Sequence, residues 1–224
     1  ESMSQLPVPP ALLDDLARVD AIILERVRPR LAVIRAAGEH ILTSGGKRIR
    51  AALTLLSAQL GEYNLERVLH SAAAVELIHA ASLVHDDLVD QAARRRGEVT
   101  VHTRWDGDVA LMVGDYFFAL AAAEMALAPD PRIIGYFSRG VMTICEGELS
   151  PVVNVAPLNI ALEQYLYKIG CKTAALFEAG CKAGMVCGGG ATEQIEALGR
   201  FGYDLGLAFQ IVDDILDIEQ SSEQ

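Results

Sequence analysis

The feature that most constrains the fold is an Asp-Asp-x-x-Asp motif that occurs twice, each time inside an apolar run with helical spacing. The first copy, in residues 82–90, consists of Asp86, Asp87 and Asp90. Side chains four residues apart share one face of a helix, where like charges repel by about a few tenths of a kcal/mol. The second copy, in residues 205–218, consists of Asp213, Asp214 and Asp217. A solvent-exposed stripe would explain one such motif, but its repetition favours a cation site.

Two acidic helices of this kind predict a metal site for a phosphorylated ligand. Carboxylates are the hard oxygen ligands that suit Mg²⁺, which rarely uses a cage made of protein alone. It usually combines one or two carboxylates with water and the phosphates of a substrate. If the two motifs face each other across a cavity, metal ions can bind between the protein and a diphosphate.

Cationic residues flank the first acidic motif in the sequence. Residues 44–50 read Ser-Gly-Gly-Lys-Arg-Ile-Arg, and three arginines follow at positions 94–96. A glycine turn that leads into a helix N-terminus with added Lys and Arg is a natural anion site. His79 lies seven residues, or about two turns, before Asp86 and therefore shares its face. A solvated basic turn and a buried neutral histidine are the alternatives, but the set as a whole matches what a diphosphate needs.

Composition argues against several classes of function. The net charge of −11 argues against general nucleic-acid binding, which needs a basic surface. The four cysteines form no Cys-x-x-Cys pair, so we interpret them as buried apolar residues in a reducing compartment, the cytoplasm. The longest apolar stretch, residues 109–128, contains Asp115 and Glu124, which argues against a membrane span. The proline-rich start does not have the pattern of a signal peptide.

Helical periodicity dominates the whole chain, and no segment has a convincing strand pattern. We expect helices over residues 12–42 (with a kink or break at Pro29), 49–60, 65–89, 108–127, 132–149, 162–186 and 193–218. No repeat is evident apart from the duplicated acidic motif. The predicted fold class is all-α, a single domain over residues 1–224 with a ligand site between facing helices.

The order of these motifs along the chain resembles that of the trans-type isoprenyl (polyprenyl) diphosphate synthases. The resemblance rests on Gly-Gly-Lys-Arg-Ile-Arg, then the histidine and first acidic motif, then Arg-Arg-Gly, Lys-Thr, and Gln before the second acidic motif. It implies a helical bundle of the isoprenoid synthase type with a central cavity, continued by further helices after residue 224. It also implies head-to-tail condensation of isopentenyl diphosphate with an allylic diphosphate, which releases pyrophosphate and requires Mg²⁺.

The resemblance also assigns roles to individual residues by their position in the motifs. The isopentenyl diphosphate site would comprise Lys47, Arg50, His79 and Arg96. The allylic diphosphate site would comprise Arg95, Lys172, Thr173 and Gln210. The Mg²⁺ ligands would be Asp86, Asp90, Asp213 and Asp217, with Asp87 and Asp214 beside them among the catalytic residues.

These residue types suit such a reaction independently of the resemblance. Breaking an allylic C–O bond builds negative charge on the leaving diphosphate, which Mg²⁺ and fixed cations stabilise. An apolar pocket that excludes water protects the allylic cation, and no protein nucleophile is needed. Two other classes remain open, a non-catalytic partner subunit of an active synthase and a class I terpene cyclase. A di-metal carboxylate bundle is disfavoured because the chain has no Glu-x-x-His motif.

Two small residues before the first acidic motif bear on product length. Ala81 and Ser82 lie roughly one turn before Asp86, where similar synthases with short products carry a bulky aromatic residue. Small residues there predict a product of twenty carbons or longer, although ordinary close helix packing also explains them. The floor of the channel would then come from Ile78 or from the aromatic residues at positions 116–118. The resemblance further implies a homodimer, for which the Ala-rich segment 111–127 could supply the interface.

Overall fold

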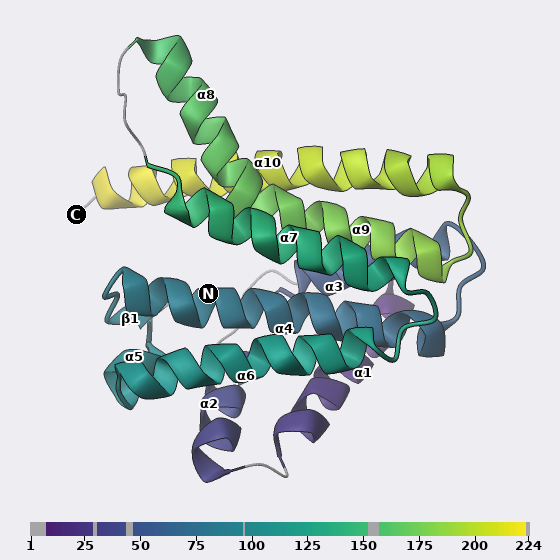
Figure 1. Ribbon diagram of the computed structural model, residues 1–224, viewed down its shortest axis with the longest axis horizontal. Coiled ribbons are helices and arrows are strands. Elements are labelled where there is room, and N and C mark those ends of the chain that lie inside the picture. The colour runs from purple at the N-terminus through teal and green to yellow at the C-terminus, as the bar shows by residue number, and fades with distance from the viewer. Residues whose placement is uncertain (1–7, 29–30, 44–46, 96, 152–156, 223–224) are drawn as a thin grey trace.

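The computed structural model describes residues 8–28, 31–43, 47–95, 97–151 and 157–222, and these form a bundle of helices (Figure 1). In chain order the α-helices are α1 (Pro10–Val27), α2 (Ala32–Thr43), α3 (Ile49–Gln59), α4 (Leu65–Val89), α5 (Val101–Arg104), α6 (Gly107–Met125), α7 (Arg132–Leu149), α8 (Leu158–Ile169), α9 (Ala175–Cys187) and α10 (Thr192–Ser222). A π-helical turn, η1 (Gly170–Ala174), joins α8 to α9. The all-α prediction is confirmed.

Two departures from the expected elements matter for the site. The segment expected as one helix over residues 162–186 is instead divided among α8, η1 and α9. A short antiparallel pair, β1 (Arg94–Arg95) and β2 (Glu98–Val99), follows α4, where no strand was expected. Gly97 makes the turn possible because its φ of +83° is a conformation that side chains disfavour. The remaining prediction of a break near Pro29 is confirmed, because α1 and α2 are separate helices.

Helix α4 is the central element of the bundle. It packs against α1, α3, α6 and α9, and most of its residues between Val68 and Val84 are buried. A helix that is apolar on all sides belongs in a protein core or in a membrane. Within the described residues, α4 alone is long and apolar enough to cross a membrane, but 72% of its most apolar window lies inside the bundle. This burial marks α4 as a core helix.

A buried ion-pair cluster fixes α1 and α6 against α4. Glu124 on α6 is only 1% exposed, and the Arg26 guanidinium of α1 donates to it at 2.5 Å. His70 Nδ1 of α4 lies 2.6 Å from the other carboxylate oxygen. A buried carboxylate needs such partners because an unpaired charge in the core is costly. The cluster therefore explains how an acid is accommodated in the apolar stretch of α6.

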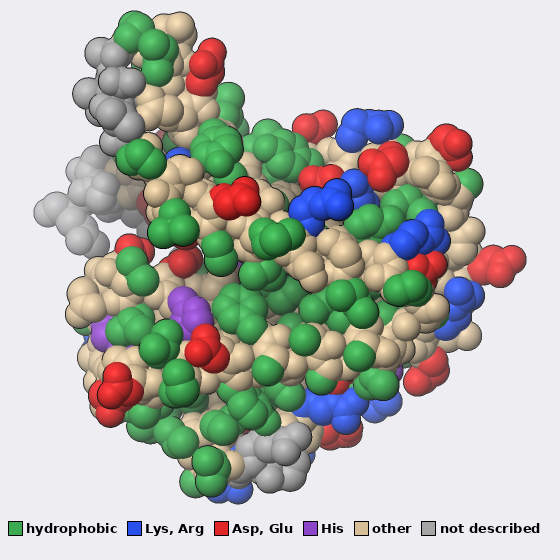
Figure 2. All heavy atoms as spheres, viewed as in Figure 1, with side chains coloured by type: hydrophobic (Ala, Val, Ile, Leu, Met, Phe, Trp, Pro, Cys, Tyr) green, Lys and Arg blue, Asp and Glu red, His purple; other side chains and the backbone are tan. Residues whose placement is uncertain are grey.

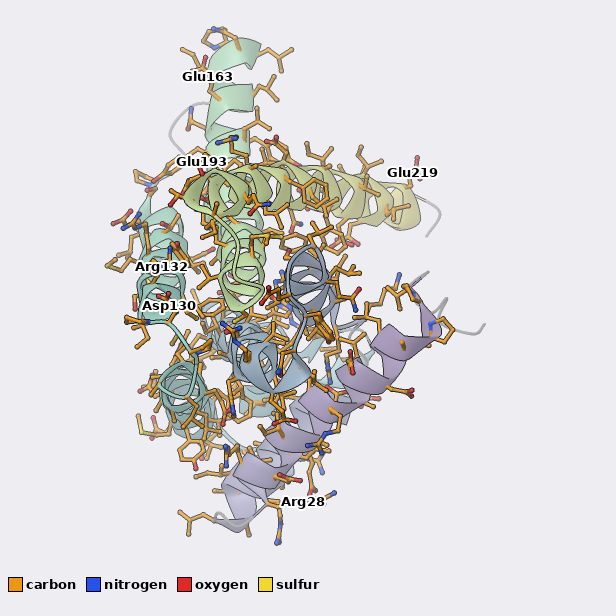
Figure 3. All side chains as sticks on the ribbon, turned by 90° about the vertical axis from the view of Figure 1, so that its right-hand side faces the viewer. Arg28, Asp130, Arg132, Glu163, Glu193 and Glu219 are labelled. Atoms are coloured by element: carbon orange, nitrogen blue, oxygen red, sulfur yellow. The ribbon has the colours of Figure 1, made fainter. Side chains whose placement is uncertain are left out.

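The second half of the chain lies across the first half. Helices α7, α9 and α10 lie above α4 and α6 in Figure 1, and α8 projects from the body of the molecule. The side view shows the same projection, with Glu163 of α8 far from Arg28 at the end of α1 (Figure 3). Glycine allows the closest of these approaches. A Cβ on Gly184 of α9 would lie 2.1 Å from the Thr54 carbonyl oxygen of α3.

Candidate active site

The first acidic motif occupies the C-terminal end of α4, and its three carboxylates have different environments. Asp86 is half-buried, with its Oδ2 3.6 Å from Lys172 Nζ. Burial raises the pKa of Asp86 above its ordinary value, by more than the nearby Lys172 lowers it. Asp90 is exposed and caps the end of the helix. Asp86 and Asp90 are thus the two acids of this motif that can reach a ligand.

The carboxylate of Asp87 is instead paired with Arg95 and anchors the β1–β2 hairpin that follows α4. Its carboxylate is buried and accepts two hydrogen bonds from Arg95 Nε at 2.9 and 3.0 Å, with Arg95 Nη2 2.8 Å from Oδ1. Its carbonyl oxygen accepts a hydrogen bond from Ala92 N at 3.0 Å. Arg95, which the resemblance assigned to the allylic diphosphate, is therefore bound to a protein carboxylate in this structure. Asp87 fixes the position of the arginine segment relative to α4.

The Lys-Thr pair lies in the π-helical turn η1, and its two consecutive side chains contact different helices. Lys172 Nζ approaches Asp86 of α4 and lies 4.0 Å from Glu148 at the end of α7. Thr173 is buried, and its hydroxyl donates to Gln210 Oε1 of α10 at 2.6 Å. Single π-helical turns often mark functional sites. Here the turn brings the α4 acids and the α10 acids to the same end of the molecule.

The second acidic motif is held by a chain of hydrogen bonds. Gln210 Nε2 donates to Asp214 Oδ1 at 2.8 Å, and Tyr165 of α8 donates its hydroxyl to Asp214 Oδ2 at 2.7 Å. Burial and the adjacent Asp214 raise the pKa of Tyr165 to about 12. Gly206 lets α10 approach η1, because a Cβ there would lie 2.6 Å from Ala174 Cα. Asp214 therefore orients the motif, as Asp87 does in the first copy.

Asp213 and Asp217 of the same motif are exposed. Within the described residues, no group of three or more His, Cys, Asp or Glu side chains is arranged to hold a metal ion. The carboxylates do not form a protein cage.

The predicted isopentenyl diphosphate site lies partly within the described residues. Lys47 is exposed, and His79 is half-buried on α4. Arg50 lies in the first turn of α3 and is 9% exposed, with its guanidinium carbon 5.0 Å from the centroid of the Phe177 ring. Such a cation–π contact fixes the guanidinium plane without using up its N–H donors. Arg96 and the two glycines at positions 45 and 46 lie outside the described residues.

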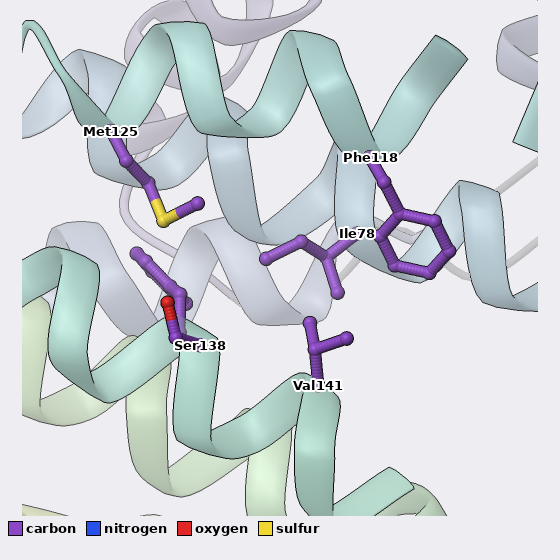
Figure 4. A pocket seen from close by; sticks show the side chains of 6 residues that line it. Ile78, Phe118, Met125, Ser138 and Val141 are labelled. Carbon is purple, nitrogen blue, oxygen red and sulfur yellow. The ribbon is translucent and has the colours of Figure 1, made fainter. Parts of the chain in front are cut away.

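An apolar pocket of about 300 Å³ lies between α4, α6 and α7. Figure 4 shows Ile78 of α4 and Phe118 of α6 pointing toward Val141 of α7, with Met125 and Ser138 on the other side. The pocket is completed by Phe137. Ile78 lies eight residues before Asp86, which is about 12 Å along a helix. The pocket therefore lies beside the same helix as the acids, roughly two turns toward the N-terminus of α4.

The chain is similar in sequence and fold to known proteins. A family model described as polyprenyl synthetase matches residues 31–224. The chain belongs to the polyprenyl synthetase family. Heptaprenyl diphosphate synthase component 2 of Geobacillus stearothermophilus is 39% identical over 95% of this chain and 67% of its own length.

Solved structures of related proteins have the same fold as this chain. A decaprenyl diphosphate synthase from Rhodobacter capsulatus superposes with a TM-score of 0.85 at 41% identity, over 92% of this chain and 64% of that one. A polyprenyl synthase from Caulobacter crescentus CB15, complexed with calcium and isoprenyl diphosphate, gives 0.86 at 39% identity over 92% and 63%. The chain thus spans about two thirds of the length of these relatives.

The structure brings together many of the residues predicted for a polyprenyl synthetase site, and it adds one. Lys172 contacts Asp86, and Thr173 contacts Gln210, so the Lys-Thr turn meets both halves of the site. Gln210 in turn donates to Asp214, which brings one acid of each motif into one connected region. Tyr165 was not predicted, because no local pattern shows that α8 leans against α10. Of the two residues predicted to affect product length, Ala81 is fully buried in the core and Ser82 is half-buried. Ser82 Oγ donates to the His79 carbonyl oxygen at 2.8 Å.

Proposed function

We propose that this protein condenses isopentenyl diphosphate head-to-tail with an allylic diphosphate, giving a trans-polyprenyl diphosphate of twenty carbons or longer and pyrophosphate. The observation that carries the proposal is the meeting of two acidic motifs at a single Lys-Thr turn. An apolar pocket lies on the same central helix. Carboxylates suit metal-bound diphosphate, Lys172 suits a phosphate oxygen, and the pocket suits a hydrocarbon tail.

Mg²⁺ is the cation that we propose, with Asp86, Asp90, Asp213 and Asp217 as its ligands. When bound, it would neutralise charge that develops on the leaving diphosphate. The residues themselves supply the rest of the site. Lys172 stands beside Asp86, so that a phosphate entering between the two motifs meets a cation as well as the acids. Asp87 and Asp214 keep their hydrogen-bonded positions and orient the two helices.

The apolar part of the site would protect the allylic cation and receive the growing chain. Carbon–oxygen cleavage leaves positive charge on the allyl group, which water would otherwise capture. The side chains of Ile78, Phe118 and Val141 give the pocket an apolar lining, which would suit such a cation. The new carbon–carbon bond forms at the isopentenyl double bond, and the proton that is then lost passes to the departing pyrophosphate. No side chain of the protein forms a covalent bond with the substrate.

We propose a homodimer as the assembled form, and one relative points to a second possibility. Hydrophobic side chains gather over α6 and α7 on the face shown in Figure 2. The exposed ones include Leu111, Met112, Leu127, Ile134 and Met142. Exposed apolar patches of this kind mark interaction sites. The Geobacillus relative is named as component 2 of its synthase, so a different subunit is the competing partner for this face.

The test uses the protein with Mg²⁺, radiolabelled isopentenyl diphosphate and farnesyl diphosphate as the allylic primer. Chromatography of the extracted products is expected to show a ladder that ends at one chain length. Asp213→Asn and added chelator should each abolish the ladder, whereas Asp204→Asn, an exposed acid on the same helix, should not. Absence of product with farnesyl, geranyl and dimethylallyl primers alike would contradict the proposal for this chain acting alone.

A further inference from the structure

Helix α3, which carries Arg50 in its first turn, begins without a side-chain cap from the residue that precedes it. The residue before it, Arg48, adopts a left-handed conformation with φ of 50° and provides no side-chain cap to the helix. Its side chain instead donates to Asp20 of α1, with Nε 2.6 Å from Oδ1. The first N–H groups of a helix have no partner within the helix and need another acceptor. Helix α3 must therefore obtain its cap from elsewhere.

Glu76 of α4 provides that cap. The backbone N–H of Ala51, the third residue of α3, donates to Glu76 Oε1 at 2.9 Å. Glu76 is 6% exposed and Ala51 is fully buried, so water does not replace this contact. A carboxylate is well suited to the position, because the N-terminus of a helix carries partial positive charge. A glutamate is long enough to reach it from a neighbouring helix.

The same contact fixes the distance between two predicted ligands of isopentenyl diphosphate. Arg50 directly precedes Ala51 in α3, and His79 follows Glu76 by three residues on one face of α4. Anchoring the first turn of α3 to Glu76 therefore holds Arg50 in register with His79. The guanidinium of Arg50 is held separately by the ring of Phe177, which it stacks over. Neither contact depends on a ligand being present.

We propose that Glu76 is a positioning residue for the isopentenyl diphosphate site and acts through the first turn of α3. The identity of the ligand rests on the proposed function, whereas the contact itself does not. Glu76 is 6% exposed and its Oε1 accepts from Ala51 N, so it acts through α3 and not by touching the diphosphate. Its loss should loosen Arg50 and weaken binding of isopentenyl diphosphate. The allylic diphosphate, which meets Lys172 and the acidic motifs at the far end of α4, should be bound as before.

The test compares Glu76→Ala, Glu76→Gln and the control Ser71→Ala in the whole protein by titration calorimetry with Mg²⁺. Glu76→Ala is expected to raise the Kd for isopentenyl diphosphate about tenfold and to change that for farnesyl diphosphate less than about twofold. Glu76→Gln retains an acceptor oxygen and should recover most of the affinity. Ser71 is buried on the same helix, with its Oγ 3.7 Å from Cys187 Sγ, and its change should affect neither ligand.

Amide hydrogen exchange at Ala51 gives a readout that needs neither ligand nor turnover. Protection of this amide should fall in Glu76→Ala and persist in Glu76→Gln. Wild-type affinity for isopentenyl diphosphate in folded Glu76→Ala would overturn the proposal, as would an equal loss for both diphosphates. If Glu76→Ala does not fold, Glu76→Asp keeps the charge but shortens the reach by one methylene, and the same selective loss is expected. Inactive wild-type protein would count against the proposed function, while the exchange result still tests the contact.

Discussion

At the scale of single residues, Asp86 shows the energetic cost of assembling an anion-rich site. Its carboxylate is half-buried, and burial opposes ionisation more than Lys172 favours it. Asp87 lies beside it in the sequence, yet it is buried with a bidentate arginine partner. Of two consecutive acids, one is therefore held by a bidentate arginine, whereas the other is paired loosely with Lys172, 3.6 Å away, and can reach a ligand. A carboxylate with a raised pKa is typical of functional positions.

Asp86→Asn is expected to make the protein more stable at pH 7 while lowering turnover at least about 100-fold. Because the pKa is raised in the folded state, the stability that this carboxyl contributes is fully present below its ordinary value of about 3.9 and is lost as the pH rises through its folded value. At pH 7 the ionised group opposes folding, and a neutral amide removes that effect.

Thermal melts of the metal-free wild type and Asp86→Asn at pH 7 and pH 3 check this prediction. A higher melting temperature for the variant is expected at pH 7, and the difference should shrink at pH 3. Asp204→Asn, on an exposed part of α10, serves as the control and should show little change at either pH. A lower melting temperature for Asp86→Asn at pH 7 would contradict the argument.

At the scale of elements, the π-helical turn decides how the two halves of the site meet. An uninterrupted α-helix over this segment would place side chains at a spacing of 3.6 residues per turn. The wider turn at η1 allows Lys172 to contact α4 and Thr173 to contact α10. Helix α8 adds the hydroxyl of Tyr165, which donates a hydrogen bond to Asp214 of α10. Three elements thus orient one carboxylate, Asp214.

Tyr165→Phe is expected to lower kcat about tenfold or more, because the Asp214 carboxylate loses the hydrogen bond that the Tyr165 hydroxyl donates to it. The change removes one hydroxyl and leaves the ring in place, so the fold should survive. Tyr167→Phe makes the same chemical change two residues away on an exposed part of α8 and is the matched control. Steady-state rates over a range of Mg²⁺ concentrations measure the effect. Equal rates for the two variants would remove Tyr165 from the site.

The pocket between α4, α6 and α7 makes a prediction about product length. Val141→Phe places a larger side chain in the apolar space beside Ile78 and Phe118, so the main product should shorten by at least one five-carbon unit. Met142→Phe enlarges the neighbouring exposed position on α7 and should leave the product unchanged. Chromatography of dephosphorylated products separates the outcomes. An unchanged product from Val141→Phe would show that the chain does not enter this pocket.

Ala81→Phe would test the predicted role of Ala81 in product length less directly than Val141→Phe tests the pocket. Ala81 is fully buried within the main core, where added volume forces neighbouring side chains out of their preferred rotamers. Such overpacking typically costs about 1–3 kcal/mol of stability. A shorter product from this variant is still expected, but a loss of folded protein would accompany it.

At the scale of the whole molecule, the exposed apolar face of α6 and α7 is a feature that the site does not use. Leu111 is 45% exposed and Met112 is 57% exposed, next to the alanines of α6. On the inner side of α6, the buried Glu124 is paired with Arg26 and His70 of the same chain. The apolar side chains on the outer face of α6 are not covered by any of the described residues, which fits burial against another subunit.

We expect sedimentation velocity to show a dimer at micromolar concentration and Leu111→Glu to shift it toward monomer. A charge buried without a partner at an interface is costly, so the association constant should fall by about two orders of magnitude or more. Leu60→Glu alters an exposed leucine just after α3 and should leave the dimer intact. A monomeric wild type would contradict the homodimer and favour a different partner subunit.

The acidic motifs, their helices and the family could all be inferred from the sequence, because each depends on local spacing. A repeated Asp-Asp-x-x-Asp in apolar helices fixes both the period and the chemistry. The order of the cationic motifs adds specificity that no single motif has. Product length was less accessible, because a residue such as Ile78 lines the pocket only when α6 and α7 are placed beside it.

The tertiary structure alone decided which members of each motif are bound by the protein and which remain for a ligand. Asp87 and Asp214 have the same identity and spacing as their neighbours, yet one meets Arg95 and the other meets Tyr165 and Gln210. Likewise, nothing near Glu76 in the sequence shows that it caps α3. The sequence by itself determined the helices and the reacting groups through local periodicity. Contacts between helices determined their roles, because burial and hydrogen-bond partners come from residues distant in the chain.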